Sequence, residues 1–195
     1  MNSTNKSPRL ALTTQQMVRA ALFTALVIVF AIIPPLPMPF VPVPLTLQTL
    51  GVMLAGLILS PRLAALAMLL YVVLALVGFP VLPGGRGGLA VFAGPTGGFI
   101  LGFIPGAFVV SWLAARNQSE TTTAAMIARN FGAAVFGGAI VVYAIGVPWL
   151  AMVTGMTMDR ALMAVVVFLP GDLVKAVIAT IVALRVAKLQ IINNP

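Results

Sequence analysis

Long apolar segments alternate along the chain with shorter stretches that are polar, proline-rich or glycine-rich. A helix that crosses a lipid bilayer needs about 20 predominantly apolar residues, and several of these segments approach that length. The pattern predicts an all-α integral membrane protein with six transmembrane helices, at about 17–34, 45–60, 62–79, 97–115, 124–147 and 170–189. Residues 1–16 are predicted to form an N-terminal segment outside the membrane, and residues 17–190 a single membrane domain.

Prolines and glycines set the predicted boundaries in the first half of the chain. The first apolar run is followed by prolines and by no small-residue cleavage site, so we interpret it as a retained helix and not as a secretory signal peptide. Residues 34–44 hold six prolines in eleven positions, a composition that favours an extended, stiff segment. Residues 83–98 are rich in glycine and are predicted to form a re-entrant or capping segment.

Two prolines define the predicted boundaries in the second half. The fifth helix is predicted to end at Val147, just before Pro148. Proline favours the first turn of a helix, so the sixth helix is predicted to begin at Pro170, and 20 residues from there are enough to cross the bilayer core. Residues 161–169 would then form a short outer segment, and a continuous helix kinked at the proline is the alternative.

The composition narrows the chemistry available to the chain. Hydrophobic residues make up 61% of it and charged residues 7%, whereas soluble domains carry about 25% charged residues, which argues against a soluble fold. The acids are Glu120, Asp159 and Asp172, and histidine and cysteine are absent. This excludes His/Cys metal sites, thiol catalysis and histidine acid–base catalysis, so we expect no metal, no cofactor and no enzymatic activity.

The net charge of +8 is scattered and does not form a nucleic-acid-binding patch, so no nucleic-acid partner is expected. Arg86 and Arg160 fall in loops on one side of the predicted bundle. The other side holds eight basic residues, namely Lys6, Arg9, Arg19, Arg62, Arg116, Arg129, Arg185 and Lys188. Because Lys and Arg accumulate in cytoplasmic loops, both termini are predicted to be cytoplasmic.

Asp172 and Lys175 are the strongest candidates for a functional site. They lie three positions apart in the outer third of the sixth predicted helix, and so share one face. Ionisable groups inside a membrane span are costly and usually face a partner or an aqueous cavity. One interpretation is a polar ligand site, in which Lys175 neutralises a carboxylate and Asp172 accepts N–H bonds. The other is an ion pair that only stabilises the bundle, with Asp172 favoured near a helix N-terminus.

Three further residues are candidates for ligand contacts. Arg86 is the one charge in the glycine-rich segment, and it is either a clamp for an anion arriving from outside or a solvated loop residue. Gln48 needs a hydrogen-bond partner within a span, and interhelical packing is its first interpretation, ahead of ligand contact. Tyr143 falls at the depth where aromatic belts sit, which is its default interpretation.

Three stretches of the chain together resemble the BioY family, the biotin-specific substrate-binding (S) components of energy-coupling factor (ECF) transporters. They are PVPLTLQTLGVMLAG at 42–56, GGRGGLAVFAGPTGGFILGF at 84–103 and PGDLVKA at 170–176. Their order and spacing, with the six-helix frame, extend the resemblance over nearly the whole chain. It implies a protein of the cell membrane that captures biotin from outside and passes it inward with a transmembrane coupling protein and two cytoplasmic ATPases.

The resemblance also implies roles for particular residues. Asp172 and Lys175 match the family's biotin-binding positions, and the glycine-rich segment around Arg86 belongs to the same site. Ala21 and Ala25 match the family's AxxxA pattern on the first helix, which implies contact with the coupling protein.

The chemistry of biotin agrees with these residues. Its carboxylate needs a cation, from Lys175 or Arg86, its ureido N–H groups need an acceptor, Asp172, and its ring and tail need an apolar sleeve. A self-contained ion- or proton-coupled transporter or channel is the alternative function, with the Asp172–Lys175 pair as a proton relay. No further titratable groups continue such a path along the sequence.

Overall fold

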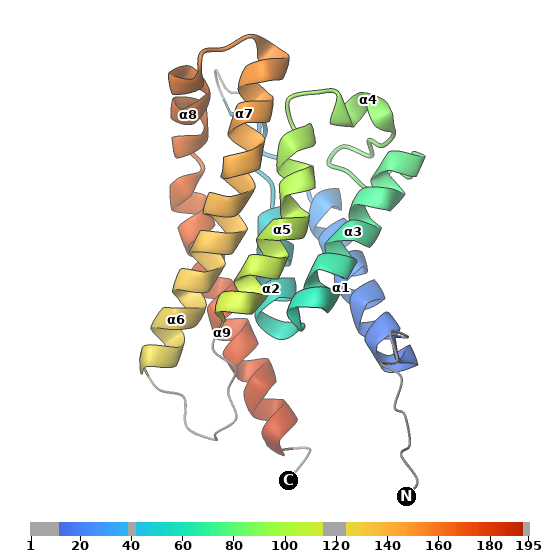
Figure 1. Ribbon diagram of the computed structural model, residues 1–195, viewed down its shortest axis with the longest axis vertical. Helices are drawn as coiled ribbons and strands as arrows, with labels where there is room; N and C mark the ends of the chain where they lie inside the picture. The colour runs from blue at the N-terminus through green and yellow to red at the C-terminus, as the bar shows by residue number, and fades with distance from the viewer. Residues whose placement is uncertain (1–11, 39–41, 115–123, 193–195) are drawn as a thin grey trace, which may run out of the picture.

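Helices form almost all of the chain that the structure describes, and they pack lengthwise into one bundle (Figure 1). The structure is a computed structural model, and the residues described are 12–38, 42–114 and 124–192. Within these ranges the chain forms no β-strand, only two isolated bridges. The elements are α1 (Thr14–Ile32), α2 (Gln48–Ile58), α3 (Pro61–Val77), α4 (Leu89–Phe92), α5 (Gly97–Leu113), α6 (Ala124–Val135), the π-helical segment η1 (Phe136–Val141), α7 (Val142–Thr154), α8 (Met158–Val166) and α9 (Leu169–Ile192).

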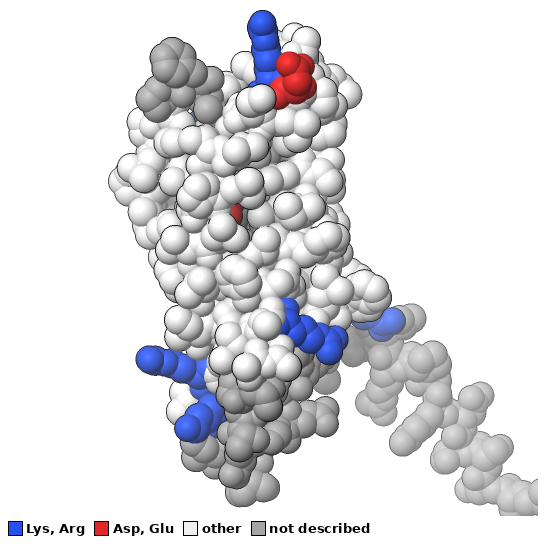
Figure 2. All heavy atoms as spheres, turned by 90° about the vertical axis from the view of Figure 1, so that its left-hand side faces the viewer, with Lys and Arg blue, Asp and Glu red and all other residues white. Residues whose placement is uncertain are grey.

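The two ends of the bundle carry different segments and different charges. The start of α1, the turn between α2 and α3, the start of α6 and the end of α9 lie together at one end, whereas α4 and the α7–α8 connection lie at the other (Figure 1). On the face shown in Figure 2, basic side chains gather at the first end, and one group of basic and acidic atoms marks the opposite end.

Several helices are apolar enough for a bilayer. α1 and the continuous helix Ala124–Thr154 are each long and apolar enough to cross it, and the bent pair α8–α9 adds a third span if it is taken as one. α2, α3 and α5 are apolar but shorter, with 11 to 17 residues. The described part of the chain is therefore an all-helical fold with two to three long apolar spans and three shorter apolar helices.

The proline-rich segment turns back on itself before α2. Leu36 and Leu45 exchange both backbone hydrogen bonds at 3.0 Å, so the described residues of 34–44 are non-helical and Leu45 is held as a bridge residue. α2 consequently begins at Gln48 and not near 45 as expected. This arrangement places Val43, Pro44 and Leu45 beside the start of α2, where they line the cavity described below.

The fifth predicted helix does not end at Val147. It continues through Pro148 to Thr154, where Gly155 takes a left-handed conformation with φ 70°. Proline lacks an N–H and interrupts only the helical bond to the carbonyl four residues earlier, a loss that helices of membrane proteins tolerate. The six-residue π-helical segment η1 lies in the same helix, upstream of the proline.

The sixth predicted helix begins close to the expected position. α9 starts at Leu169, so Pro170 falls in its first turn. Residues 161–169, expected as a short outer segment, are largely the helix α8, which is bent by 50° relative to α9 across a short break. Bend and break together place Phe168 and Asp172 at the inner surface of the bundle, where both are buried.

Close backbone contact joins α5 to the α6–η1–α7 helix. A Cβ atom on Gly137 would lie 2.6 Å from the backbone N of Val110 and 2.7 Å from the carbonyl oxygen of Gly106, so only glycine fits there. A Cβ on Gly146 would lie 2.3 Å from the ring of Phe99. Small residues allow such close approach between membrane helices, and here they hold Tyr143 of α7 beside the aromatic residues of α5.

Candidate ligand-binding site

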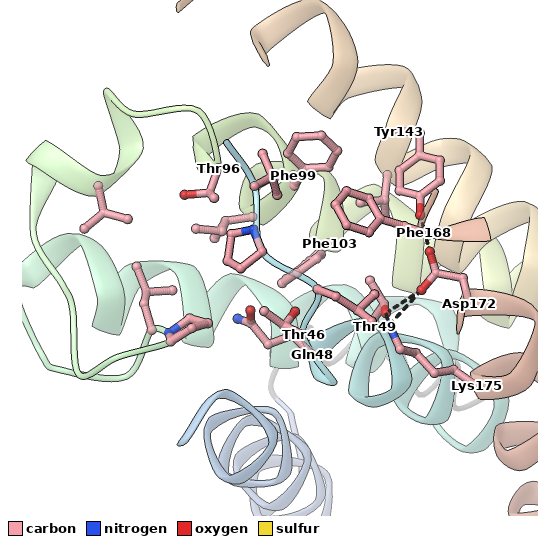
Figure 3. A pocket seen from close by; sticks show the side chains of 18 of the residues that line it. Thr46, Gln48, Thr49, Thr96, Phe99, Phe103, Tyr143, Phe168, Asp172 and Lys175 are labelled. Carbon is pink, nitrogen blue, oxygen red and sulfur yellow. Dashed lines mark hydrogen bonds and ion pairs between the residues drawn. The ribbon is translucent and has the colours of Figure 1, made fainter. Parts of the chain in front are cut away.

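A cavity lies inside the bundle, lined by residues of α2, α5, α7 and the start of α9 and by the segment that includes α4 (Figure 3). It has about 70 Å³ of space for the centres of water molecules, and roughly 10–15 Å³ is enough for one water. Its lining residues are Val43, Pro44, Leu45, Thr46, Gln48, Thr49, Leu82, Pro83, Arg86, Val91, Thr96, Phe99, Ile100, Phe103, Val142, Tyr143, Phe168, Asp172 and Lys175.

Asp172, Lys175 and Thr49 form a closed triangle of hydrogen bonds at the inner end of the cavity (Figure 3). Lys175 Nζ donates to Asp172 Oδ1 at 2.9 Å and to Thr49 Oγ1 at 2.9 Å. The Thr49 hydroxyl in turn donates to Asp172 Oδ1 at 3.0 Å. Asp172 and Lys175 are only 3% and 5% exposed, so this pair is buried, and hydrogen bonds compensate both charges.

Tyr143 reaches the same carboxylate from α7. Its hydroxyl donates to Asp172 Oδ2, and its ring packs edge-on against Phe99 with centroids 6.2 Å apart. Figure 3 shows the phenol and the carboxylate pointing toward each other. The side chain is thus directed into the bundle and not toward a membrane surface, which differs from the aromatic-belt interpretation.

The hydrogen bonds formed within the triangle leave two positions for a ligand. Among the described residues, Oδ1 of Asp172 accepts from Thr49 and Lys175, and Oδ2 accepts from Tyr143. Each carboxylate oxygen offers two acceptor positions and an ammonium three donors. One acceptor position therefore remains at Oδ2 of Asp172 and one N–H remains at Nζ of Lys175. This donor and this acceptor are buried next to each other, so they suit a polar ligand group that both donates and accepts hydrogen bonds.

Arg86 lies at the exposed edge, or mouth, of the cavity. It is exposed, and its Nε donates to the carbonyl of Pro83 at 3.0 Å. Its backbone exchanges hydrogen bonds with Leu82 at 3.0 and 3.3 Å across a turn in which Gly84 and Gly85 have positive φ. Arg86 also lines an adjoining hollow, with Ala90 and other residues of the glycine-rich segment. Arg86 thus places a cation at the exposed edge of the cavity.

Gln48 both packs between helices and lines the cavity. Its amide nitrogen donates to the hydroxyl of Tyr71 on α3, and that hydroxyl donates to the carbonyl of Val81. Both interpretations of Gln48 from the sequence therefore have a structural counterpart. The wall between the two polar ends of the cavity is apolar and aromatic, with Phe99, Phe103 and Phe168 all buried.

Ala21 and Ala25 lie elsewhere. Both are on the exposed face of α1, whereas Ala20 and Thr24 are buried against the bundle. The Thr24 hydroxyl donates to the carbonyl of Ala67 on α3 at 2.8 Å, which fixes the rotation of α1. The two small side chains therefore lie on the face of α1 that is turned away from the bundle.

The structure brings Asp172, Lys175, Gln48, Tyr143 and Arg86 to the lining of one cavity. Sequence reasoning assigned no role to Thr49, the third member of the triangle, or to the three phenylalanines. The polar cluster Thr46, Gln48 and Thr49 ahead of an apolar helix was the available signal for Thr49. Apolar residues at cavity positions are indistinguishable in sequence from those that pack the core.

Comparison with known proteins gives consistent matches over most of the chain. The model of the BioY family matches residues 2–191. The chain is 43% identical over 172 residues to a biotin transporter BioY of Rhizobium etli, covering 87% of this chain and 91% of that protein. It is 39% identical over 172 residues to a probable biotin transporter BioY of Bacillus subtilis, covering 88% and 90%.

One solved structure has the same fold. A crystal structure of the S-component for biotin from an ECF-type ABC transporter superposes with a TM-score of 0.83 at 30% identity, covering 91% of this chain and 95% of that one. The similarity extends over the helices that surround the cavity, because the matched region spans nearly all of both chains.

Proposed function

The chain belongs to the BioY family, and from this premise we propose that it binds biotin at the outer face of the cell membrane and passes it inward with ATPase-driven partners. It is a transport component and not an enzyme. Support comes from the relatives named as biotin transporters and from the likeness to a biotin S-component of an ECF-type transporter. The observation that carries the proposal is the buried Asp172–Lys175 pair, which faces a cavity and retains one free acceptor and one free donor position.

The ureido group of biotin fits these two positions. It presents N–H donors next to a carbonyl acceptor, so one N–H binds Oδ2 of Asp172 while the carbonyl accepts the remaining N–H of Lys175. Thr49 and Tyr143 hold the carboxylate in the required orientation. Because Asp172 and Lys175 are buried, each hydrogen bond of the ligand to one of these charged groups contributes about 1.5–3 kcal/mol.

The rest of biotin follows the cavity outward. The sulfur-containing ring and the pentanoate tail lie between Phe99, Phe103 and Phe168, which are buried and apolar. The carboxylate then reaches Arg86 at the mouth, since Lys175 is already engaged with Asp172 and Thr49. This assigns the two cations to different ends of the ligand.

We further propose a topology and an assembly for the chain. Residues 17–190 form a membrane domain of six transmembrane helices with residues 1–16 and both termini in the cytoplasm, as the distribution of basic residues favours. Ala21 and Ala25 contact a transmembrane coupling protein, and two cytoplasmic ATPases complete the transporter. In this orientation the mouth of the cavity and Arg86 face outward.

Mass spectrometry of ligand carried through purification tests the function. The protein is purified from cells grown with biotin, and no ligand is added during purification. It should then release about one biotin per chain on denaturation. Vesicles containing the chain with its ATPase partners should take up biotin only with ATP. A different small molecule in the cavity, or uptake by the chain alone driven by a proton gradient, would instead support the self-contained transporter.

A further inference from the structure

A second hollow lies on the outer surface of the bundle, between α7 and α8. It has a volume of about 390 Å³, larger than the 70 Å³ of the ligand cavity on the same measure. Nine of its ten lining residues are apolar, contributed by η1, α7, α8 and the first residue of α9. The tenth is Tyr143, which also lines the ligand cavity, so this side chain borders both spaces.

Water is a poor occupant of this crevice. An ordered water needs two to four polar partners, and the one polar side chain in the lining, Tyr143, directs its hydroxyl to Asp172. An empty space of this size would leave its lining atoms without van der Waals contacts on one side. The crevice is therefore suited to a hydrocarbon chain.

The surroundings of the crevice are those of a membrane span. α7 belongs to the 31-residue apolar helix Ala124–Thr154, and α8 belongs to the bent apolar pair with α9. Leu162 and Val166, which line the crevice, are 52% and 56% exposed, so it opens sideways at the surface. Figure 2 faces this side of the molecule and shows its middle as uncharged except for one acidic atom visible in a recess.

The position of the crevice favours lipid over a partner helix as its occupant. α1, with the exposed Ala21 and Ala25 proposed to contact the coupling protein, lies on the opposite side of the bundle from α7 and α8 (Figure 1). The crevice opens instead between two apolar helices of membrane-spanning composition, where acyl chains of the bilayer surround the protein.

We propose that the crevice between α7 and α8 binds one acyl chain of a membrane phospholipid. This site is separate from the biotin cavity, and its membrane setting rests on the proposed function. The bound chain packs against the face of Tyr143 that is turned away from the ligand cavity. It thereby supports the ring whose hydroxyl holds Asp172.

Native mass spectrometry of chain released from phosphatidylcholine–phosphatidylglycerol nanodiscs tests the proposal. Ala144 lines the crevice, whereas the adjacent Ile145 is exposed to the membrane without lining it. Ala144→Phe fills the space and should lose one retained phospholipid relative to the wild type, and Ile145→Phe should lose none. Equal lipid counts in the two variants and the wild type would overturn the proposal.

A second pair of variants tests the opposite wall in case Ala144→Phe fails to fold. Leu162 lines the crevice and Met163 does not, although both are exposed on α8. Leu162→Trp should lose one phospholipid and Met163→Trp should keep it, with an unchanged helical circular-dichroism spectrum and a monodisperse elution profile as the criterion of folding. A wild-type dimer that dissociates in Leu162→Trp would show that a second copy of the chain occupies the crevice, and would also overturn the proposal.

Discussion

The hydroxyl of Tyr143 donates a hydrogen bond to Oδ2 of Asp172, across the interface between α7 and α9. The oxygen that accepts it is the one we propose to bind a ureido N–H of biotin. Tyr143 therefore orients the acceptor without taking its last free position, while Thr49 and Lys175 hold the other oxygen.

Tyr143→Phe should weaken biotin binding roughly tenfold, because the carboxylate loses one of three donors and rotates more freely. A hydrogen bond to a charged group contributes about 1.5–3 kcal/mol. The loss of affinity should lie near the lower end of this range, because Asp172 still accepts the N–H of the ligand. Titration calorimetry of the purified chain measures the change.

Tyr71 is the other tyrosine of the chain, and its hydroxyl bonds Gln48 and Val81. Tyr71→Phe should reduce thermal stability more than affinity, and the reverse order would contradict the assigned roles.

Asp172→Asn and Lys175→Met should each lower biotin affinity by a factor of ten to a hundred or more. Each substitution removes a partner of the ureido group and leaves the neighbouring charge without its buried counterpart, so stability also falls. The double variant carries no isolated charge and should regain stability. Biotin binding by the folded double variant is decisive. Affinity equal to the wild type would mean that the pair is structural and that the site lies elsewhere, near Arg86.

Arg86→Gln should weaken binding of biotin but not of biotin methyl ester, because the ester has no carboxylate for the guanidinium to pair with. Loss of the pair at an exposed position is expected to cost about one order of magnitude or less. Competition binding with both ligands measures the difference. If Arg86→Gln weakens the two ligands equally while Lys175→Met weakens only biotin, Lys175 is the carboxylate partner and the ligand is bound in the opposite direction.

The local part of the site could be predicted from the sequence, and the long-range part could not. Asp172 and Lys175 are three positions apart, and helix geometry alone places them on one face. Thr49 lies 123 positions from Asp172 in the chain, so its contact depends on how α2 packs against α9. No periodicity in either helix specifies that packing.

Tyr143 was harder to place because the sequence indicated only its depth, which is that of aromatic-belt residues, and depth does not determine which way a side chain points. The π-helical segment η1 ends two residues before it, and a shift of one residue turns a helix face by about 100°. A regular helical period therefore does not give the face of α7 on which Tyr143 lies. The same helix passes Pro148, where the sequence predicted its end, because the chain tolerates the lost bond inside an apolar bundle.

The proposed topology predicts which single cysteines react in intact cells. The chain has no cysteine of its own, so each introduced thiol is the only one. Arg160→Cys, exposed beside the α7–α8 connection, should react with a membrane-impermeant maleimide in sealed right-side-out cells, whereas Arg185→Cys on α9 should be protected until the membrane is opened. Labelling of Arg185→Cys in sealed cells that still bind biotin would show the opposite orientation.

Ala21→Leu combined with Ala25→Leu should abolish assembly with the coupling protein while leaving biotin binding nearly unchanged. Both alanines are on the exposed face of α1, so added side chains project away from the bundle and block the close approach of another helix. Co-purification of the tagged coupling protein, with biotin titration of the isolated chain, measures the two effects separately.

Ala20 is adjacent but fully buried, so Ala20→Leu should instead destabilise the chain, since overpacking a core costs about 1–3 kcal/mol. If the double variant assembles normally, α1 does not contact the partner through these residues, and if it loses biotin together with assembly, they pack the bundle.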